Sequence, residues 1–267
     1  MIQLDKLYIK ALETSIQASE EIMRIYQTSF QKKLKTDGSP VTEADTASAK
    51  IIVDQLRDFG IPIISEEDPN DAFQERKEWK EVWIIDPLDG TKEYIRRNGE
   101  FAVNIALVRE GKPVFGIIAS PVNRTILLGG DEIGAYILDF DQIYSPSKWE
   151  KLTISTINSP IVLASSRTPY RGREVEFIEK IKKHDEVDFI KKGSALKFFD
   201  LAEGRADVYP RFAPTMEWDI AAGQAILEAL GGVVLNVEDG LPLKYNKESL
   251  LNPHFIAKTK GFIDLMG

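Results

Sequence analysis

Residues 81–91 read EVWIIDPLDGT and join an apolar segment to a turn that carries two carboxylates. Pro87 fixes its own φ, so we expect it to stop the strand and to let Asp86 and Asp89 turn to the same side. Gly90 lets the backbone approach a ligand closely. A helix that began directly after this glycine would point free N–H groups at an anion. The stretch therefore predicts a strand end that offers carboxylates and backbone donors together.

Two further segments place acids where an apolar segment ends or a helix begins. Glu66 follows the apolar residues 61–65, and Asp219 lies at the expected start of a helix. Strand ends and helix starts that share one sheet edge are where α/β proteins build their sites. Asp86 and Asp89 are a pair of hard oxygen ligands, which suits Mg²⁺ better than Zn²⁺. The chain has two histidines and no cysteine, so a zinc site of histidines or thiolates is disfavoured.

Each of these acids also has an ordinary structural interpretation. The turn at Glu66 fits a solvated acidic loop, the turn at Asp86 fits a plain β-turn, and Asp219 fits the first turn of a helix. Asp45 stands three residues after Thr42, where the acid of a helix capping box would stand. The residues alone leave these alternatives open, and only the combination favours a shared cation site.

The remaining chain alternates helical and extended patterns, which predicts a mixed α/β protein. Helices are expected over residues 2–30, 42–57, 174–183, 194–203 and 218–230, with a short closing helix. Strands are expected over residues 61–65, 81–85, 101–109, 114–120, 125–128, 161–164, 187–190, 207–209, 233–236 and 254–257. The irregular residues 139–151 predict a boundary between residues 1–140, which carry most of the candidate ligands, and residues 141–267, which carry Asp219.

Composition narrows the possible functions. The 267 residues are 43% hydrophobic, enough for a large core, and the net charge of −8 disfavours nucleic-acid binding through a broad basic surface. No run approaches the roughly 18 apolar residues that cross a bilayer. The charged first ten residues do not read as a signal peptide, and the lack of cysteine fits a reducing cytoplasm.

These residues resemble the inositol monophosphatase superfamily of lithium-sensitive, magnesium-dependent phosphatases. The likeness runs over nearly the whole chain and rests on DPLDGT at 86–91, WDIAAG at 218–223, VTEAD at 41–45 and SEE at 65–67. The stretches that resemble its bacterial 3′(2′),5′-bisphosphate nucleotidase branch are 100–107, 193–197 and 202–211. The resemblance implies an α/β fold of the layered αβαβα sandwich type.

Carried over residue by residue, the resemblance implies two or three Mg²⁺ ions per site. One ion would be held by Glu66, Asp86 and the backbone carbonyl of Leu88. A second ion would be held by Asp86, Asp89 and Asp219, so that Asp86 is shared.

The resemblance also implies roles in catalysis and substrate binding. Asp45 and Thr91 would activate the attacking water, with Glu66 as a further catalytic residue, and the backbone of Gly90 and Thr91 would hold the scissile phosphate. Arg211 is expected at the second phosphate. The substrate-binding residues implied in this way are Leu88, Asp89, Gly90, Thr91, Ser194, Lys197, Arg211 and Asp219.

The implied reaction removes the 3′-phosphate of adenosine 3′,5′-bisphosphate to give AMP and phosphate, a clearance step in sulfate assimilation. The alternatives are an inositol monophosphatase or sugar bisphosphatase of the same superfamily, or an inactive phosphate or metal sensor. One departure is residues 166–169, SRTP, which lack the histidine that ends the matching stretch of some relatives. The expected partner is a small nucleotide in the cytoplasm, with peripheral attachment to the cytoplasmic face of the inner membrane as an option. The oligomeric state is not predicted.

Overall fold

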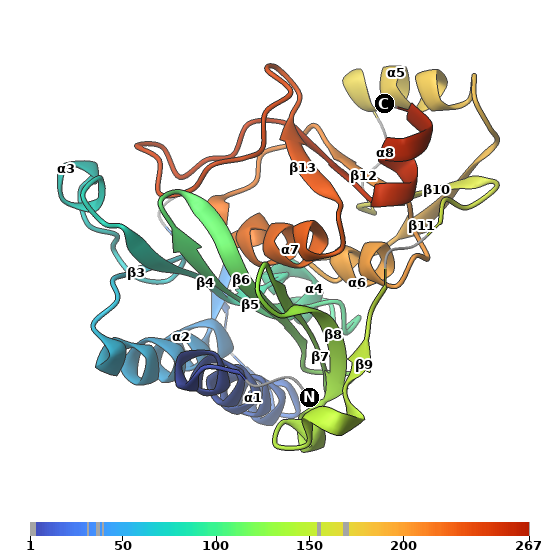
Figure 1. The fold of residues 1–267 in the computed structure, drawn as a ribbon. Helices are drawn as coiled ribbons and strands as arrows, with labels where there is room; N and C mark the ends of the chain where they lie inside the picture. The colour runs from blue at the N-terminus through green and yellow to red at the C-terminus, as the bar shows by residue number, and fades with distance from the viewer. Residues whose placement is uncertain are drawn as a thin grey trace.

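The computed structural model describes residues 4–30, 32–35, 38, 40–153, 156–167 and 171–266, and it confirms a layered α/β architecture. Helices α1 and α2 cover one face of a seven-stranded sheet, and α6 and α7 cover its other face (Figure 1). A five-stranded sheet packs on the far side of α6 and α7 and carries α5 and α8 outside it. The order of layers is the αβαβα arrangement that the sequence implies.

The elements have the following bounds. The helices are α1 Lys6–Tyr26, α2 Glu43–Leu56, α3 Phe73–Arg76, α4 Thr91–Ile95, α5 Arg173–Ile181, α6 Lys197–Ala202, α7 Glu217–Ala229 and α8 Lys260–Met266. Short 3₁₀ turns cover Arg57–Phe59, Phe140–Gln142 and Pro146–Lys148. The strands are β1 Lys32–Leu34, β2 Pro40–Thr42, β3 Ile63–Ser65, β4 Glu81–Asp89, β5 Ala102–Arg109, β6 Lys112–Ser120, β7 Thr125–Gly130, β8 Gly134–Asp139, β9 Glu150–Lys151, β10 Ile161–Ser165, β11 Val187–Lys191, β12 Val208–Arg211, β13 Val233–Asn236 and β14 Phe255–Lys258.

The seven-stranded sheet runs in the order β3 to β9, with β3 parallel to β4 and every later pair antiparallel. Strand β5 is buried on both faces because helices lie on each side of the sheet. The meander expected over residues 101–128 is confirmed, and β8 and β9 continue it beyond the expected strands. The division of the chain near residue 140 stays a prediction, and β9 beyond it still pairs with β8.

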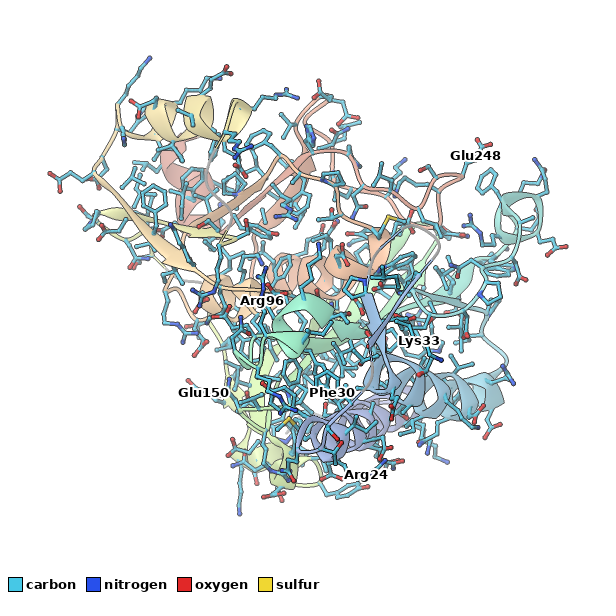
Figure 2. The ribbon with its side chains drawn as sticks, turned by 180° about the vertical axis from the view of Figure 1, so that it is seen from behind. Arg24, Phe30, Lys33, Arg96, Glu150 and Glu248 are labelled. Atoms are coloured by element: carbon cyan, nitrogen blue, oxygen red, sulfur yellow. The ribbon has the colours of Figure 1, made fainter. Side chains whose placement is uncertain are left out.

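The five-stranded sheet has the order β11-β10-β12-β14-β13 and is parallel at one end and antiparallel at the other. Its strands lie close to the expected residues. A small hairpin of β1 and β2, which the sequence did not predict, lies beside α2. Viewed from behind, this hairpin with Lys33 and the end of α4 with Arg96 are on the same side of the molecule (Figure 2). No helix within the described ranges is both long and apolar enough to cross a membrane.

Strand β4 runs through to Asp89, so the expectation that Pro87 stops it is wrong. Asp86 pairs with Asn104 and Asp89 pairs with Ala102, and the register shifts between these two pairs. Pro87 therefore lies in a bulge, where its missing N–H removes no ladder hydrogen bond. The bulge still turns the chain as expected, because a bulged strand bends at the extra residue.

Helix α7 is buried on almost every side between the two sheets, as its apolar sequence predicts. Its backbone lies directly on strand β6. A Cβ atom at Gly116 would lie 2.2 Å from the carbonyl oxygen of Ala222, so only glycine fits at this contact. This close approach brings the start of α7 to the level at which β3 and β4 end (Figure 1).

Candidate active site

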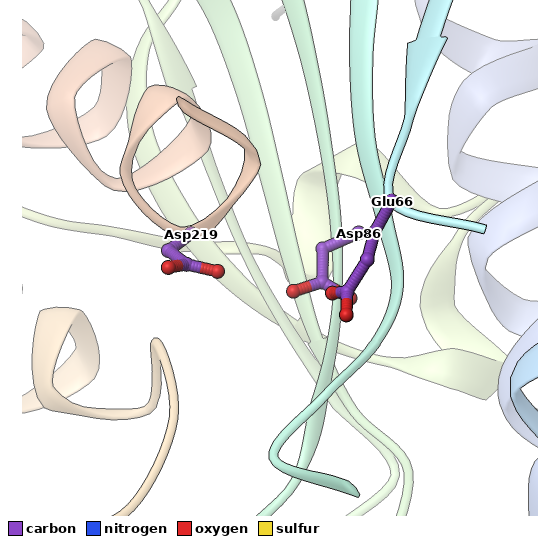
Figure 3. Close-up of side chains that lie close together, drawn as sticks. All are labelled: Glu66, Asp86 and Asp219. Atoms are coloured by element: carbon purple, nitrogen blue, oxygen red, sulfur yellow. The ribbon is translucent and has the colours of Figure 1, made fainter. Parts of the chain in front are cut away.

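Three carboxylates from separate elements converge where β3 and β4 end. Glu66 follows β3, Asp86 lies in β4, and Asp219 lies in the first turn of α7. Each offers one ligand oxygen, and these atoms all lie within 4.8 Å of one another. Figure 3 shows Asp219 reaching from its helix toward the two acids on the strands. The sequence prediction placed these three residues in one site, and the fold brings them together.

The cluster is electrostatically unfavourable without a cation. Burial raises the pKa of Asp86 well above its usual value, and neighbouring Glu66, Asp89 and Asp219 raise it further. Burial followed by the charge of Asp89 raises the pKa of Asp219 to about 8. Within the described part of the chain, no lysine or arginine forms an ion pair with Asp86, Asp89 or Asp219. Buried acids of this kind need an added positive charge, and oxygen donors suit Mg²⁺. The residues therefore fit the predicted metal.

Asp89 lies beside this cluster, and other groups hold one of its oxygens. Its Oδ2 accepts hydrogen bonds from the backbone N–H of Ala195 at 2.5 Å and from Asn104 Nδ2 at 3.2 Å. Burial raises its pKa to about 6, although the charge of Lys197 opposes the shift. The sequence analysis gave Asn104 no role. Its signal was a polar residue inside an otherwise apolar strand, paired with Asp86.

Asp45 contacts both Thr42, as the acid of a helix capping box would, and Thr91, its expected catalytic partner. The residues alone had left these two roles open. Its Oδ2 accepts hydrogen bonds from the N–H of Thr42 at 2.7 Å and from the Thr42 hydroxyl at 2.6 Å, which completes a helix capping box. Its Oδ1 accepts a hydrogen bond from the Thr91 hydroxyl at 2.8 Å. Burial raises the pKa of Asp45, and these hydrogen bonds partly oppose the shift. One carboxylate therefore caps α2 and orients a hydroxyl at the start of α4.

Residues 86–91, which we call the acidic turn, are held by short contacts. The hydroxyl of Ser48 in α2 donates to the carbonyl of Pro87 at 2.7 Å, and the N–H of Leu88 donates to Asp86 Oδ1 at 3.1 Å. Gly90 has φ +97°, and a Cβ atom there would lie 2.9 Å from the carbonyl oxygen of Glu100. Both the turn and the close approach therefore require glycine. Helix α4 begins at Thr91, the start that was considered for this glycine but not counted among the expected helices.

A lysine on the hairpin connection contacts the acids that follow β3. Lys35 Nζ lies 2.8 Å from Glu66 Oε1 and 2.7 Å from Glu67 Oε1. Burial lowers the pKa of Lys35, but its bonds to the two glutamates outweigh burial and raise it. Burial raises the pKa of Glu67 to about 7 against the opposing effect of Lys35. The sequence analysis missed Lys35, because the contact depends on the unpredicted hairpin.

A cleft of about 500 Å³ opens next to the carboxylates and shares Asp89 and Asp219 with the site. The cleft also contains all three residues that the sequence analysis placed at the nucleotide, namely Ser194, Lys197 and Arg211. Lys92, Arg96 and Arg167 add positive charge to its wall. Residues 166–169 are the SRTP stretch that lacks the histidine of some relatives, and residues 168 and 169 of it lie outside the described residues.

The buried lysine of the cleft is held in a fixed position. Lys197 Nζ donates to the carbonyl of Ser194 at 2.5 Å and lies 5.0 Å from the centre of the Tyr209 ring. Burial lowers the pKa of Lys197 to about 8, and the charge of Asp89 opposes the shift. Arg211 keeps its Nε buried without a hydrogen-bond partner in the described structure. The cleft therefore presents cations beside an acidic floor, an arrangement that suits a ligand with more than one anionic group.

Comparison with known proteins places the chain among enzymes of one family. The model of the inositol monophosphatase family matches residues 3–263. The chain is 38% identical over 243 residues to the 3′(2′),5′-bisphosphate nucleotidase CysQ of Escherichia coli, covering 89% of this chain and 94% of the relative. It is 35% identical over 258 residues to the protein of the same name from Haemophilus influenzae, covering 94% and 92%. The crystal structure of CysQ from Bacteroides thetaiotaomicron, described as a bacterial member of the inositol monophosphatase family, superposes with a TM-score of 0.83. That match has 39% identity and covers 94% of this chain and 96% of the other.

Proposed function

The chain belongs to the inositol monophosphatase family, and from that premise we propose that it hydrolyses adenosine 3′,5′-bisphosphate to AMP and phosphate with Mg²⁺. The observation that carries the proposal is a cluster of one buried and two half-buried carboxylates that adjoins a cation-lined cleft. The reaction class follows from the carboxylates, and the preference for a nucleotide bisphosphate follows from the cleft and from the bisphosphate nucleotidase relatives. We also propose the cytoplasm as its location, in keeping with a chain that has no cysteine.

Two or three Mg²⁺ ions per site are proposed, and the residues assign two of them. Glu66, Asp86 and the carbonyl of Leu88 would hold the first, and Asp86, Asp89 and Asp219 would hold the second. When bound, Mg²⁺ would supply positive charge against the phosphate and make an attacking water more acidic. The raised pKa values of Asp86 and Asp219 support this assignment, because a cation would relieve the repulsion that raises them.

Asp45 and Thr91 are proposed to prepare the water for attack. The Thr91 hydroxyl donates a hydrogen bond to Asp45 Oδ1 at 2.8 Å, so its lone pairs are free to accept a hydrogen bond from the water. Burial makes Asp45 more basic than an exposed aspartate, so Asp45 can take the hydroxyl proton of Thr91 as Thr91 takes the proton that the water loses. The water oxygen then bonds to phosphorus in line as the bond from phosphorus to the 3′ oxygen breaks. The leaving oxygen takes a proton from solvent.

The remaining proposed roles concern binding. The backbone of Gly90 and Thr91, at the start of α4, is proposed to hold the phosphate that is transferred. Ser194 and Lys197 are proposed to contact the nucleotide, and Arg211 to contact the second phosphate. The buried position of Lys197 supports its role, because a fixed cation loses little entropy when it binds an anion.

A substrate panel tests the proposal. Phosphate release would be measured from adenosine 3′,5′-bisphosphate, inositol 1-phosphate and fructose 1,6-bisphosphate, with Mg²⁺ and with a chelator. We expect kcat/KM for the nucleotide to exceed that for the other two by at least about tenfold, with no release after chelation, since the second phosphate and the base add contacts worth more than about 1.4 kcal/mol.

Two other outcomes would overturn the proposal. A preference for inositol phosphate or for the sugar bisphosphate would assign the chain to another activity of the family. Binding of Mg²⁺ without phosphate release from any of the three substrates would identify the inactive sensor.

A further inference from the structure

A short segment of the C-terminal half is clasped between the acidic turn and Glu100. We call residues 193–195 the clasp. The N–H of Gly193 donates to Glu100 Oε2 at 2.9 Å, and the N–H of Ala195 donates to Asp89 Oδ2 at 2.5 Å. Ser194 lies between these two bonds and lines the cleft. The clasp is therefore anchored at one end by a proposed metal ligand and at the other by a carboxylate with no role so far.

The backbone of the clasp needs these anchors. Ser194 has φ +49°, a left-handed conformation that a residue with a side chain adopts only where its surroundings impose it. Its Cβ lies 3.3 Å from the position that a Cβ of Gly90 would occupy, so the clasp rests on the acidic turn. A Cβ at Gly193 would lie 2.9 Å from Glu93 Cγ and 3.1 Å from the Cβ of Glu100. The fit leaves no space for another side chain.

Glu100 is held in its turn by an arginine from the other sheet. Arg167, which follows β10, donates from Nε to Glu100 Oε2 at 2.8 Å and from its terminal nitrogen to Oε1. The Glu100 side chain is 17% exposed, whereas that of Arg167 is 54% exposed. Glu100 itself lies just before β5 of the seven-stranded sheet. Its carboxylate therefore receives backbone and side-chain donors from the five-stranded half at the wall of the cleft.

We propose that Glu100 is a positioning residue that sets the affinity of the cleft for the nucleotide part of the substrate. It acts through the N–H of Gly193, which fixes Ser194 in its left-handed conformation facing the cleft. Arg167 restrains the Glu100 carboxylate and is of secondary importance, because the backbone bond survives without it. Glu100 does not contact the substrate. This inference rests on the proposed function, because it takes Ser194 to contact the nucleotide.

The test compares variants that remove the two parts of the contact separately. Glu100→Ala removes the acceptor for Gly193 and the ion pair, whereas Glu100→Gln keeps an oxygen for Gly193 and removes only the charge. Glu238→Ala, which breaks the exposed ion pair with Arg173 on the C-terminal half, is the matched control. For each protein, kcat and KM for adenosine 3′,5′-bisphosphate would be measured, together with the Kd of AMP by calorimetry in Mg²⁺.

We expect Glu100→Ala to raise both KM and the Kd of AMP about tenfold while kcat stays within about threefold. Glu100→Gln should stay within about threefold in all quantities, and Glu238→Ala should match the wild type. Gly193→Ala, whose added methyl group would push the clasp away from Glu100, should reproduce the effect of Glu100→Ala. It provides the same test if Glu100→Ala fails to fold.

The inference is overturned if Glu100→Ala, or Gly193→Ala in its place, leaves KM and the Kd of AMP unchanged, or lowers kcat alone. A Glu100→Gln variant as impaired as Glu100→Ala would also overturn it, because the effect would then come from charge. Failure of the proposed function is a separate result, namely a wild-type protein that releases no phosphate from adenosine 3′,5′-bisphosphate.

Discussion

Two acids in the first turn of α7, the buried Glu217 and the half-buried Asp219, lie in opposite surroundings. Glu217 accepts hydrogen bonds from the N–H of Asn246 at 2.6 Å and from Lys247, whose Nζ lies 2.5 Å away. Asp219, two residues later, accepts a hydrogen bond from the N–H of Met216 at 2.8 Å and otherwise faces the carboxylate cluster. Glu217 is therefore paired with a lysine, whereas Asp219 lies beside other carboxylates.

The difference separates a structural acid from a functional one. Burial raises the pKa of both, but the charge of Lys247 lowers that of Glu217, whereas the charge of Asp89 raises that of Asp219 further. Glu217 has Lys247 as its counter-charge, whereas Asp219, which is proposed to bind a cation, forms no ion pair within the described residues. Clusters that are left uncompensated in this way are typical of functional sites. The following predictions test this contrast, beginning with the largest expected effect.

Asp219→Asn should lower kcat with adenosine 3′,5′-bisphosphate by about 10³-fold, because a lost metal ligand removes several kcal/mol of charge stabilisation. Phosphate release at saturating Mg²⁺ would measure the loss, and calorimetry would measure the weaker Mg²⁺ binding. Activity within about threefold of the wild type would exclude Asp219 as a metal ligand.

Asp45→Asn should lower kcat by about a hundredfold while the fold and much of the Mg²⁺ affinity remain, because it removes the base but no metal ligand. Steady-state kinetics and Mg²⁺ calorimetry on the same protein would separate the two quantities. Near-normal turnover would leave Asp45 with its capping role alone.

Glu217→Gln should have the reverse profile. The amide keeps one acceptor oxygen but faces two backbone N–H groups and a lysine, so the free energy of unfolding should fall by about 2 kcal/mol and the melting temperature by about 4–8 °C. Turnover should stay within about threefold at 25 °C. Thermal melts and kinetics on the same preparation would measure the stability and the turnover. A variant of normal stability without activity would contradict the structural role of Glu217.

The pH dependence of the metal-free protein should show the smallest of these effects. An acid with a raised pKa in the folded state contributes stability when protonated, and this stability is lost as pH rises from its usual value toward the folded one. For Asp219 the loss extends from about pH 4 to about pH 8.

Between pH 5 and pH 8, with a chelator present, the wild-type melting temperature should therefore fall by several degrees more than that of Asp219→Asn. Melting temperatures that fall equally with pH in the two proteins would show that the repulsion at Asp219 is absent. Addition of Mg²⁺ at pH 8 should stabilise the wild type more than the variant.

Much of the fold could be predicted from the sequence, because nearly continuous apolar runs mark elements that are buried on both faces. Strand β5 and helix α7 are such elements, and both lie close to the expected residues. The hairpin of β1 and β2 escaped prediction because its strands have three residues each, too few for a pattern. Pro87 misled the analysis because a bulge accepts proline where a regular ladder does not.

The candidate site divides in the same way. Asp86, Glu66 and Asp219 could be placed together because each follows a strand or begins a helix, and a resemblance joined them. The contacts of Lys35, Asn104 and Glu100 could not be predicted, because each depends on an approach between segments that only the folded chain defines. The catalytic roles proposed for Asp45 and Thr91 stay predictions.

The contact between Gly116 and Ala222 has a consequence for how the molecule tolerates change. The distance between α7 and strand β6 is set by direct contact between their backbones at Gly116 and Ala222. No side chain lies between the two elements at this point. We expect exchanges of apolar side chains elsewhere in that layer to leave the gap between Asp219 and Asp86 unchanged as long as this backbone contact holds. A methyl group at position 116 would push α7 away from β6 and so increase the distance between Asp219 and Asp86, although residue 116 does not line the cleft.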